Sequence, residues 1–130
     1  MGVGPNYGLD KGFLATGGVA YAYGDPVVQN ADGLSVAQAS AAGVSCVGVC
    51  QENIIADNVK TGKAIINIRL TGVSRVTASA VIAVNDLVAN TADKRVAKAT
   101  AGQFVLGRAL MPAKAAGDII EILLTPGVKA

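Results

Sequence analysis

The chain contains no histidine and no tryptophan, and only two phenylalanines and three tyrosines occur among its 130 residues. The missing histidine removes the commonest general base and a frequent zinc ligand. Serine nucleophiles usually depend on such a base, and no motif marks a Ser–Lys pair that would replace it. We therefore expect a protein that is not an enzyme and that needs no cofactor and no metal ion.

Cysteine and long apolar runs are also scarce. The two cysteines, Cys46 and Cys50, would lie roughly 13 Å apart in an extended strand, which is too far for a disulfide. We interpret them as small buried apolar residues. There is no run of 18 apolar residues and no charged-then-apolar start, so we expect neither a membrane span nor a signal peptide.

Charge of one sign is not concentrated anywhere, because the net charge of +2 is spread along the chain. The densest basic cluster consists of Lys94, Arg95 and Lys98, and no aromatic residue is interleaved with it. A nucleic-acid reader usually presents a concentrated basic face. We interpret the cluster as a solvated turn or strand and expect no nucleic-acid partner.

Alanine and valine are abundant, with 23 and 17 copies respectively. Each of these small side chains buries little apolar area, so the expected core is thin. Oligomerisation is a common way to stabilise such a chain. We therefore expect self-association.

The chain also contains an internal repeat. Residues 20–32 align without a gap on residues 81–93, which places Asp25 on Asp86 and Asp32 on Asp93. With small insertions the match covers about 16–77 as repeat one and 78–125 as repeat two. Turn residues and alternating apolar positions recur, whereas reactive side chains do not, and this pattern favours a structural protein.

Short runs of β-forming residues separated by turn signals predict about ten strands. In repeat one we expect strands at 19–23, 27–29, 34–38, 44–50, 64–70 and 73–77. In repeat two we expect them at 87–89, 95–98, 104–111 and 118–124, before a Pro126-Gly127 stop. Residues 51–62 should form a loop with a single helical turn, and residues 78–84 fit either a helix or a strand. The prediction is one all-β domain over residues 19–130, a barrel or a sandwich.

The candidate catalytic carboxylates are better explained as turn residues. Asp25 and Asp86 are equivalent by the repeat, and each sits immediately before a strand, where an aspartate can bond nearby backbone N–H groups. We assign the same role to the other turn aspartates. The predicted structural turn residues are Gly24, Asp25, Pro26, Asp32, Gly33, Asn85, Asp86 and Asp93.

The first 18 residues hold six glycines and Pro5, and they lie outside the repeat. Glycine at this density opposes a helix. We interpret residues 1–18 as an extended arm that becomes ordered only against a partner, and a frayed tail is the alternative.

Several glycine- and valine-rich motifs occur in a fixed order along the chain. They are Gly24-Asp25-Pro26-Val27-Val28, Gly48-Val49-Cys50, a glycine-started strand over residues 62–68, Leu70-Thr71-Gly72-Val73, Asn85-Asp86-Leu87-Val88, Gly107-Arg108-Ala109-Leu110 and a second such strand over residues 117–122. Over about residues 16–125 this order resembles the capsid decoration (cement) proteins of tailed double-stranded-DNA bacteriophages.

The resemblance implies a compact β-tulip or β-barrel fold that binds the outer surface of an expanded capsid. It implies trimers at three-fold positions that stabilise the shell against internal DNA pressure. The implied partners are the major capsid protein and the chain itself as a homotrimer, and the implied location is the virion, after synthesis in the bacterial cytoplasm. Residues 1–18 would be the arm laid on the capsid, with contacts from Val3, Pro5, Tyr7, Leu9, Phe13 and Leu14.

Two alternatives remain at this stage. The first is a small β-barrel module for ligand binding or adhesion, with a pocket between the two repeats. Its polar members would be Asn67, Arg69 and Glu121, which strand alternation directs outward. The second is a hydrolase with an unrecognised Ser–Lys pair.

Overall fold

The computed structural model describes residues 8–130, and within them the protein has nine strands and one short helix. The elements are β1 (Gly8–Ala15), β2 (Pro26–Gln29), β3 (Ser35–Gln38), β4 (Gly48–Cys50), α1 (Ala56–Lys60), β5 (Ile65–Thr77), β6 (Leu87–Asn90), β7 (Val96–Lys98), β8 (Phe104–Ala109) and β9 (Ile119–Val128). The predicted all-β class is confirmed.

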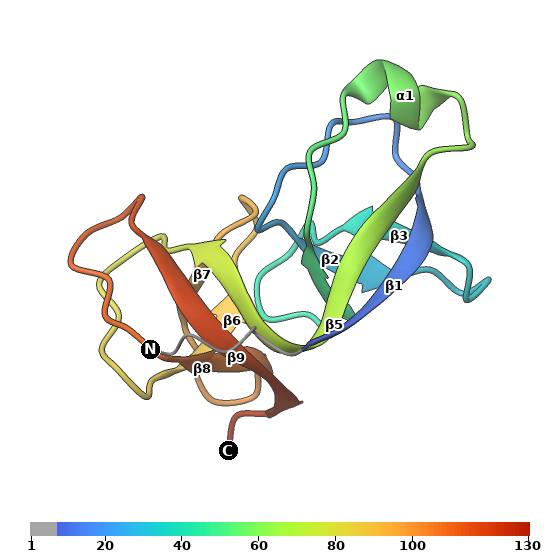
Figure 1. Cartoon of the computed structure of the whole chain (residues 1–130). Coiled ribbons are helices and arrows are strands. Elements are labelled where there is room, and N and C mark those ends of the chain that lie inside the picture. The colour runs from blue at the N-terminus through green and yellow to red at the C-terminus, as the bar shows by residue number, and fades with distance from the viewer. Residues whose placement is uncertain (1–7) are drawn as a thin grey trace.

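The strands gather into two lobes that share the long strand β5 (Figure 1). We call residues 8–71 the first lobe and residues 72–130 the second lobe. Apart from Val49 and Cys46, which pack into the second core, each lobe is filled by its own apolar residues. Phe13, Tyr21 and Ile66 are among those buried in the first lobe, whereas Val76, Ile82 and Ile120 are among those buried in the second.

In the first lobe the strand pairings form a closed ring. The order is β1-β3-β2-β4-β5, and β1 pairs with β5 as well as with β3. Only the β1–β3 contact is parallel, at Leu14 and Ala15; the other pairs are antiparallel. Closing the ring leaves few free strand edges in this lobe.

The second lobe has the same order of pairings. β6, β7, β8 and β9 pair as β2, β3, β4 and β5 do, and the aligned residues occupy matching registers. A parallel bridge between Ala78 and Val96 completes the ring at the place where Ala15 meets Val36 in the first lobe. The bridge Tyr21–Ile54 likewise has its match in Ile82–Ala113.

The register also gives β1 a counterpart in the second lobe, which is the Gly72–Thr77 half of β5. Phe13 pairs with Ile66 as Val76 pairs with Ile120. The prediction that residues 1–18 form an arm outside the domain is therefore wrong for residues 8–15. These residues make strand pairs along β5, and Phe13 and Ala15 are in the core.

Other strand boundaries differ from the sequence-based expectations. Residues 64–70 and 73–77 were expected to be separate strands, but β5 runs through both. Gly72, between them, has a φ of +100°, which glycine accepts. Residues 19–23 contribute only the bridge at Tyr21. The expected stop at residues 126–127 is also wrong, because β9 continues to Val128.

Candidate functional site

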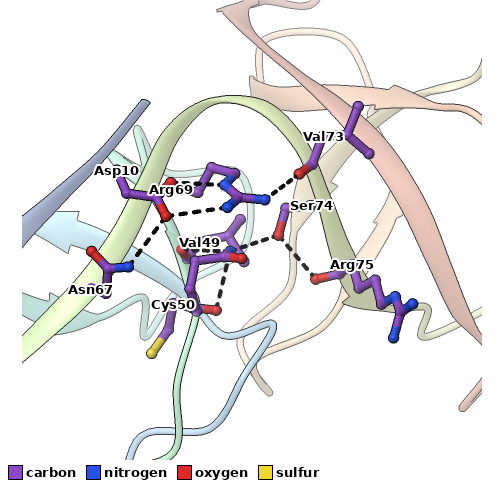
Figure 2. A network of polar contacts seen from close by, with 9 residues as sticks. Asp10, Val49, Cys50, Asn67, Arg69, Val73, Ser74 and Arg75 are labelled. Atoms are coloured by element: carbon purple, nitrogen blue, oxygen red, sulfur yellow. Dashed lines mark hydrogen bonds and ion pairs between the residues drawn. The ribbon is translucent and has the colours of Figure 1, made fainter. Parts of the chain in front are cut away.

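The most distinctive polar site lies where β5 passes from one lobe to the other (Figure 2). Asp10 of β1 accepts two hydrogen bonds from Arg69, from Nε at 2.8 Å and from Nη2 at 3.1 Å. Arg69 also donates from Nη1 to the carbonyl oxygen of Val73 at 2.8 Å, across the Gly72 position. Asn67 donates to the same carboxylate at 3.2 Å. The paired charges therefore fix the path of β5 through the junction.

A second polar contact joins the lobes at the same bend of β5 (Figure 2). The side chain of Gln51 donates from Nε2 to the hydroxyl oxygen of Ser74 at 2.8 Å and to the carbonyl oxygen of Val49 at 3.1 Å. Ser74 is buried, so this bond satisfies a hydroxyl that would otherwise be costly to bury. Gln51 directly follows β4 and thus ties the first lobe to the start of the second.

A hollow of about 520 Å³ lies beside this junction. It is lined by Tyr23, Gly24, Arg75, Val76, Thr77 and Ile119. Tyr23 and Ile119 are 44% and 64% exposed, and Arg75 contributes a charged side chain to the lining. An apolar lining with one cation fits a protein segment or an organic anion. The expected polar trio does not line it, since Asn67 and Arg69 both bond Asp10 instead.

The residues predicted as arm contacts have different surroundings. Val3, Pro5 and Tyr7 lie outside the described residues. Leu9 is 59% exposed and is available to a partner. Phe13 is only 2% exposed and packs in the first core, so its assignment as a capsid contact is wrong. Leu14 is partly buried and belongs to the β1–β3 pair.

The two repeat-related aspartates have equivalent local bonds. Asp25 accepts a hydrogen bond from the backbone N–H of Ala22 at 3.0 Å, and Asp86 accepts one from Ala83 at 2.9 Å. Each stands next to a residue with positive φ, Gly24 at +94° and Asn85 at +73°. These turns lead into β2 and β6. Both carboxylates stabilise the turns by accepting backbone hydrogen bonds, so their role is structural.

The remaining predicted turn residues flank the β2–β3 and β6–β7 connections. Asp32 accepts hydrogen bonds from the backbone N–H groups of Leu34 and Ser35, and these bonds lower its pKa. By contrast, burial raises the pKa of Asp25. Gly33 has a φ of +72°, and Asp93 accepts a hydrogen bond from the Thr91 hydroxyl.

The cysteines are free thiols in this structure. Burial raises the pKa of Cys46 to about 12 and that of Cys50 to about 11, which makes both poor nucleophiles near neutral pH. Across residues 8–130 no three acidic, cysteine or histidine side chains gather as a metal-binding group. In the same range no helix has the length and apolar character that crossing a membrane requires.

The sequence-based search missed Asp10, Gln51 and Ser74, and it also missed the hollow beside Arg75. Asp10 was hidden in a glycine-rich segment that looked unstructured. An alignment of residues 10–16 on residues 73–79, at an offset of 63 in place of 61, would have revealed β1 as a strand. Phe13 then falls on Val76 and Ala15 on Ala78.

These features define an all-β protein of two similar lobes that share one strand. No family model and no curated protein matches the sequence. Among solved structures, the chain is similar to the N base of the head fiber protein gp8.5 of bacteriophage phi29, at a TM-score of 0.65 and 15% identity. The match covers 90% of this chain and 93% of that one, so the likeness in fold extends over nearly the whole molecule.

Proposed function

We propose that this chain is a structural protein of a phage head, which binds the outer surface of the expanded capsid as a decoration protein. The observation that carries the proposal is the fold likeness to a phage head fiber base over almost the entire length of both chains. The order of turn and strand motifs, which resembles capsid decoration proteins, supports it independently. In this role the chain is not an enzyme, and its location is the virion.

The proposed stabilisation of the capsid follows from the thermodynamic linkage between binding of this chain and assembly of the shell. A protein that binds the assembled shell and not its loose subunits shifts the equilibrium toward the intact shell by mass action. Trimers at three-fold positions would strengthen the effect, because the second and third contacts of a trimer become intramolecular. The partner is the major capsid protein, and the shell so held resists the outward pressure of packaged DNA.

The test mixes the purified chain with expanded heads that lack it and images the particles. We expect added density on the outer surface at three-fold positions and a higher temperature of DNA release. Heads without added density, or with unchanged release, would reject the proposal. Unexpanded heads are the control, and we expect weaker binding to them.

The hypothesis that an N-terminal arm contacts the capsid must be tested with a truncation that leaves strand β1 intact. Deleting residues 2–7 leaves β1 intact, and we expect an unchanged melting temperature with head binding at least about tenfold weaker. Deleting residues 2–12 also removes most pairs between β1 and β5, so we expect this longer deletion to destabilise the fold. Full affinity of the shorter deletion would exclude the arm.

The hollow beside Arg75 supports a second candidate, which is binding of a ligand or an adhesion target at the junction of the lobes. A thermal-shift screen with aromatic and aliphatic carboxylates tests it, with Arg75→Gln as the matched variant. A stabilising compound that loses its effect with Arg75→Gln would support this candidate. If no compound raised the melting temperature, this second candidate would be rejected and the capsid proposal would be the one that stands.

A further inference from the structure

The first lobe packs against one edge of β5 in the second lobe. The corresponding edge of the equivalent strand in the first lobe, β1, is not covered in this way. β5 residues 73–76 pair with β9 along one edge. Along the first-lobe side, Gln51 bonds Ser74 at 2.8 Å, and Gly24 lies so close to Arg75 that an added Cβ would sit 3.3 Å from the Arg75 carbonyl oxygen. The first lobe therefore packs directly on this part of β5.

The counterpart of β5 residues 73–76 in the first lobe is β1 residues 10–13. They pair with β5 along one edge, and within residues 8–130 no strand pairs with their other edge, which we call the open edge. Leu9, Lys11 and Gly12 are exposed there. Unpaired strand edges invite pairing with another chain.

The surface of the first lobe that covers β5 also has a counterpart, on the second lobe. Tyr23, Gly24 and Gln51 correspond to Val84, Asn85 and Leu110. The Asn85 amide donates to the Ala109 carbonyl at 2.8 Å, as the Gly24 amide donates to Cys50 at 2.9 Å, so the local geometry matches. Val84 is 49% and Leu110 is 41% exposed. We call Val84, Asn85 and Leu110 the shoulder.

We propose that a second copy of this chain docks its shoulder on the open edge of β1, repeating between molecules the contact that joins the two lobes within one. The shoulder and the open edge are the counterparts of the two surfaces that meet inside the chain. Asn85 replaces Gly24 in this contact, so the two backbones must lie slightly further apart than they do within the chain. Leu110 then takes the place of Gln51 and faces Lys11, the counterpart of Ser74. The Lys11 ammonium lies over the Phe13 ring, with Nζ 5.6 Å from the ring centroid. The aliphatic stem of this exposed residue offers Leu110 an apolar surface.

Because the shoulder and the open edge are different patches, the contact is head-to-tail. Such contacts close into rings or continue as filaments, and they do not form two-fold dimers. A ring of three is the form that the proposed capsid trimers would take. The self-contact does not depend on the capsid, so its failure would leave head binding by single copies testable on its own.

The experiment uses charge exchange in the full chain. Leu110→Lys places a cation against Lys11, and Lys11→Asp places a carboxylate against Leu110. Both positions are exposed, and thermal melts check that each variant is folded. By sedimentation velocity we expect the wild-type chain to self-associate and each variant alone to lose at least about tenfold in affinity.

An equimolar mixture of the two variants should recover head-to-tail association of unlike copies, although a closed ring of three would keep one contact between like copies. One contact in the mixture is the wild-type one, and in the other the introduced lysine faces the introduced aspartate. Ile55→Lys, at an exposed residue of the first lobe just before α1 and outside both patches, is the control and should associate like the wild type. A wild-type chain that stays monomeric, single variants that associate normally, or a mixture that stays monomeric would each overturn the proposal.

Discussion

The two lobes have the same strand pairings but fill and join them differently. In the first lobe the core contains Phe13 and Tyr21, whereas their second-lobe counterparts are Val76 and Ile82. The Tyr21 hydroxyl donates to the Thr16 carbonyl at 2.6 Å, and Ile82 has no such group. The backbone pattern and the turn aspartates are shared, so one arrangement of strands accepts two quite different interiors.

The same comparison holds at the junction. Asp10 pairs with Arg69 across β1 and β5, and at the matching register Val73 pairs with Leu123 across β5 and β9. One cross-strand pair is ionic and the other is apolar. Strand register is thus preserved while the chemistry of the pair changes, and the ionic version occurs where the chain must turn from one lobe into the next.

The largest expected effect comes from the glycines that the lobes share. An added Cβ at Gly48 would collide with the Arg69 carbonyl oxygen, and one at Gly107 with the Leu123 carbonyl oxygen. We expect Gly48→Ala and Gly107→Ala each to lower the free energy of unfolding by about 3 kcal/mol or more. Urea unfolding measures this, with Gly127→Ala as the control because its Cβ would meet open space. A large difference between the two variants would break the equivalence of the lobes.

Exchanging core residues between the lobes should have the next largest effect. Tyr21→Ile leaves a cavity, and we expect a loss of about 2–4 kcal/mol. Tyr21→Phe removes only the hydroxyl and its bond to Thr16, at a cost of about 1 kcal/mol. Thermal and urea unfolding of both variants separates volume from hydrogen bonding. Equal losses would show that the hydroxyl, and not the ring, matters in the first lobe.

A double-mutant cycle on the Asp10–Arg69 pair tests whether the ionic pair of the first lobe can be replaced by the apolar pair of the second. Arg69→Leu alone leaves Asp10 partly buried without its partner, and we expect a loss of about 1–3 kcal/mol. Combining it with Asp10→Val installs the apolar pair of the second lobe, and much of that loss should be recovered. Additive losses in urea unfolding would mean that Arg69 acts mainly through its bond to Val73.

The smallest expected effect is on the stability of the fold at acidic pH. The lowered pKa of Asp32 means that its ionised form stabilises the fold above about pH 4, and this contribution is lost as pH falls through the folded pKa. The raised pKa of Asp25 has the opposite sign, so its ionisation weakens the fold as pH rises through the folded value. Asp32→Asn should flatten the acid limb of stability against pH, and Asp25→Asn should not.

Much of the strand pattern was predictable because turn chemistry marks it. Asp25 and Asp86, with Gly24 and Asn85 beside them, define the entries to β2 and β6 both in the sequence and in the structure. The helical turn predicted within residues 51–62 is present as α1. Alternation also directed Asn67 outward, and in the structure Asn67 is exposed while its neighbours Ile66 and Ile68 are fully buried.

β1 was missed because its glycines were attributed to flexibility. In the structure a Cβ on Gly8 or Gly12 would lie 2.9 Å from the Arg69 and Ile65 side chains respectively, so these glycines permit close packing. Sequence alone cannot distinguish the two uses of glycine, because the neighbour across the sheet is 50 or more residues away. The Asp10–Arg69 pair was hidden for the same reason.

The sharing of β5 has a consequence for how the molecule comes apart. There is no linker between the lobes, and any cut within residues 65–77 would take a strand from one ring or the other. A truncated chain that ends near residue 71 would still contain all five strands of the first ring. It would, however, expose Val49, which packs in the second core of the intact protein. Melting should therefore be a single calorimetric event, and neither half should survive on its own.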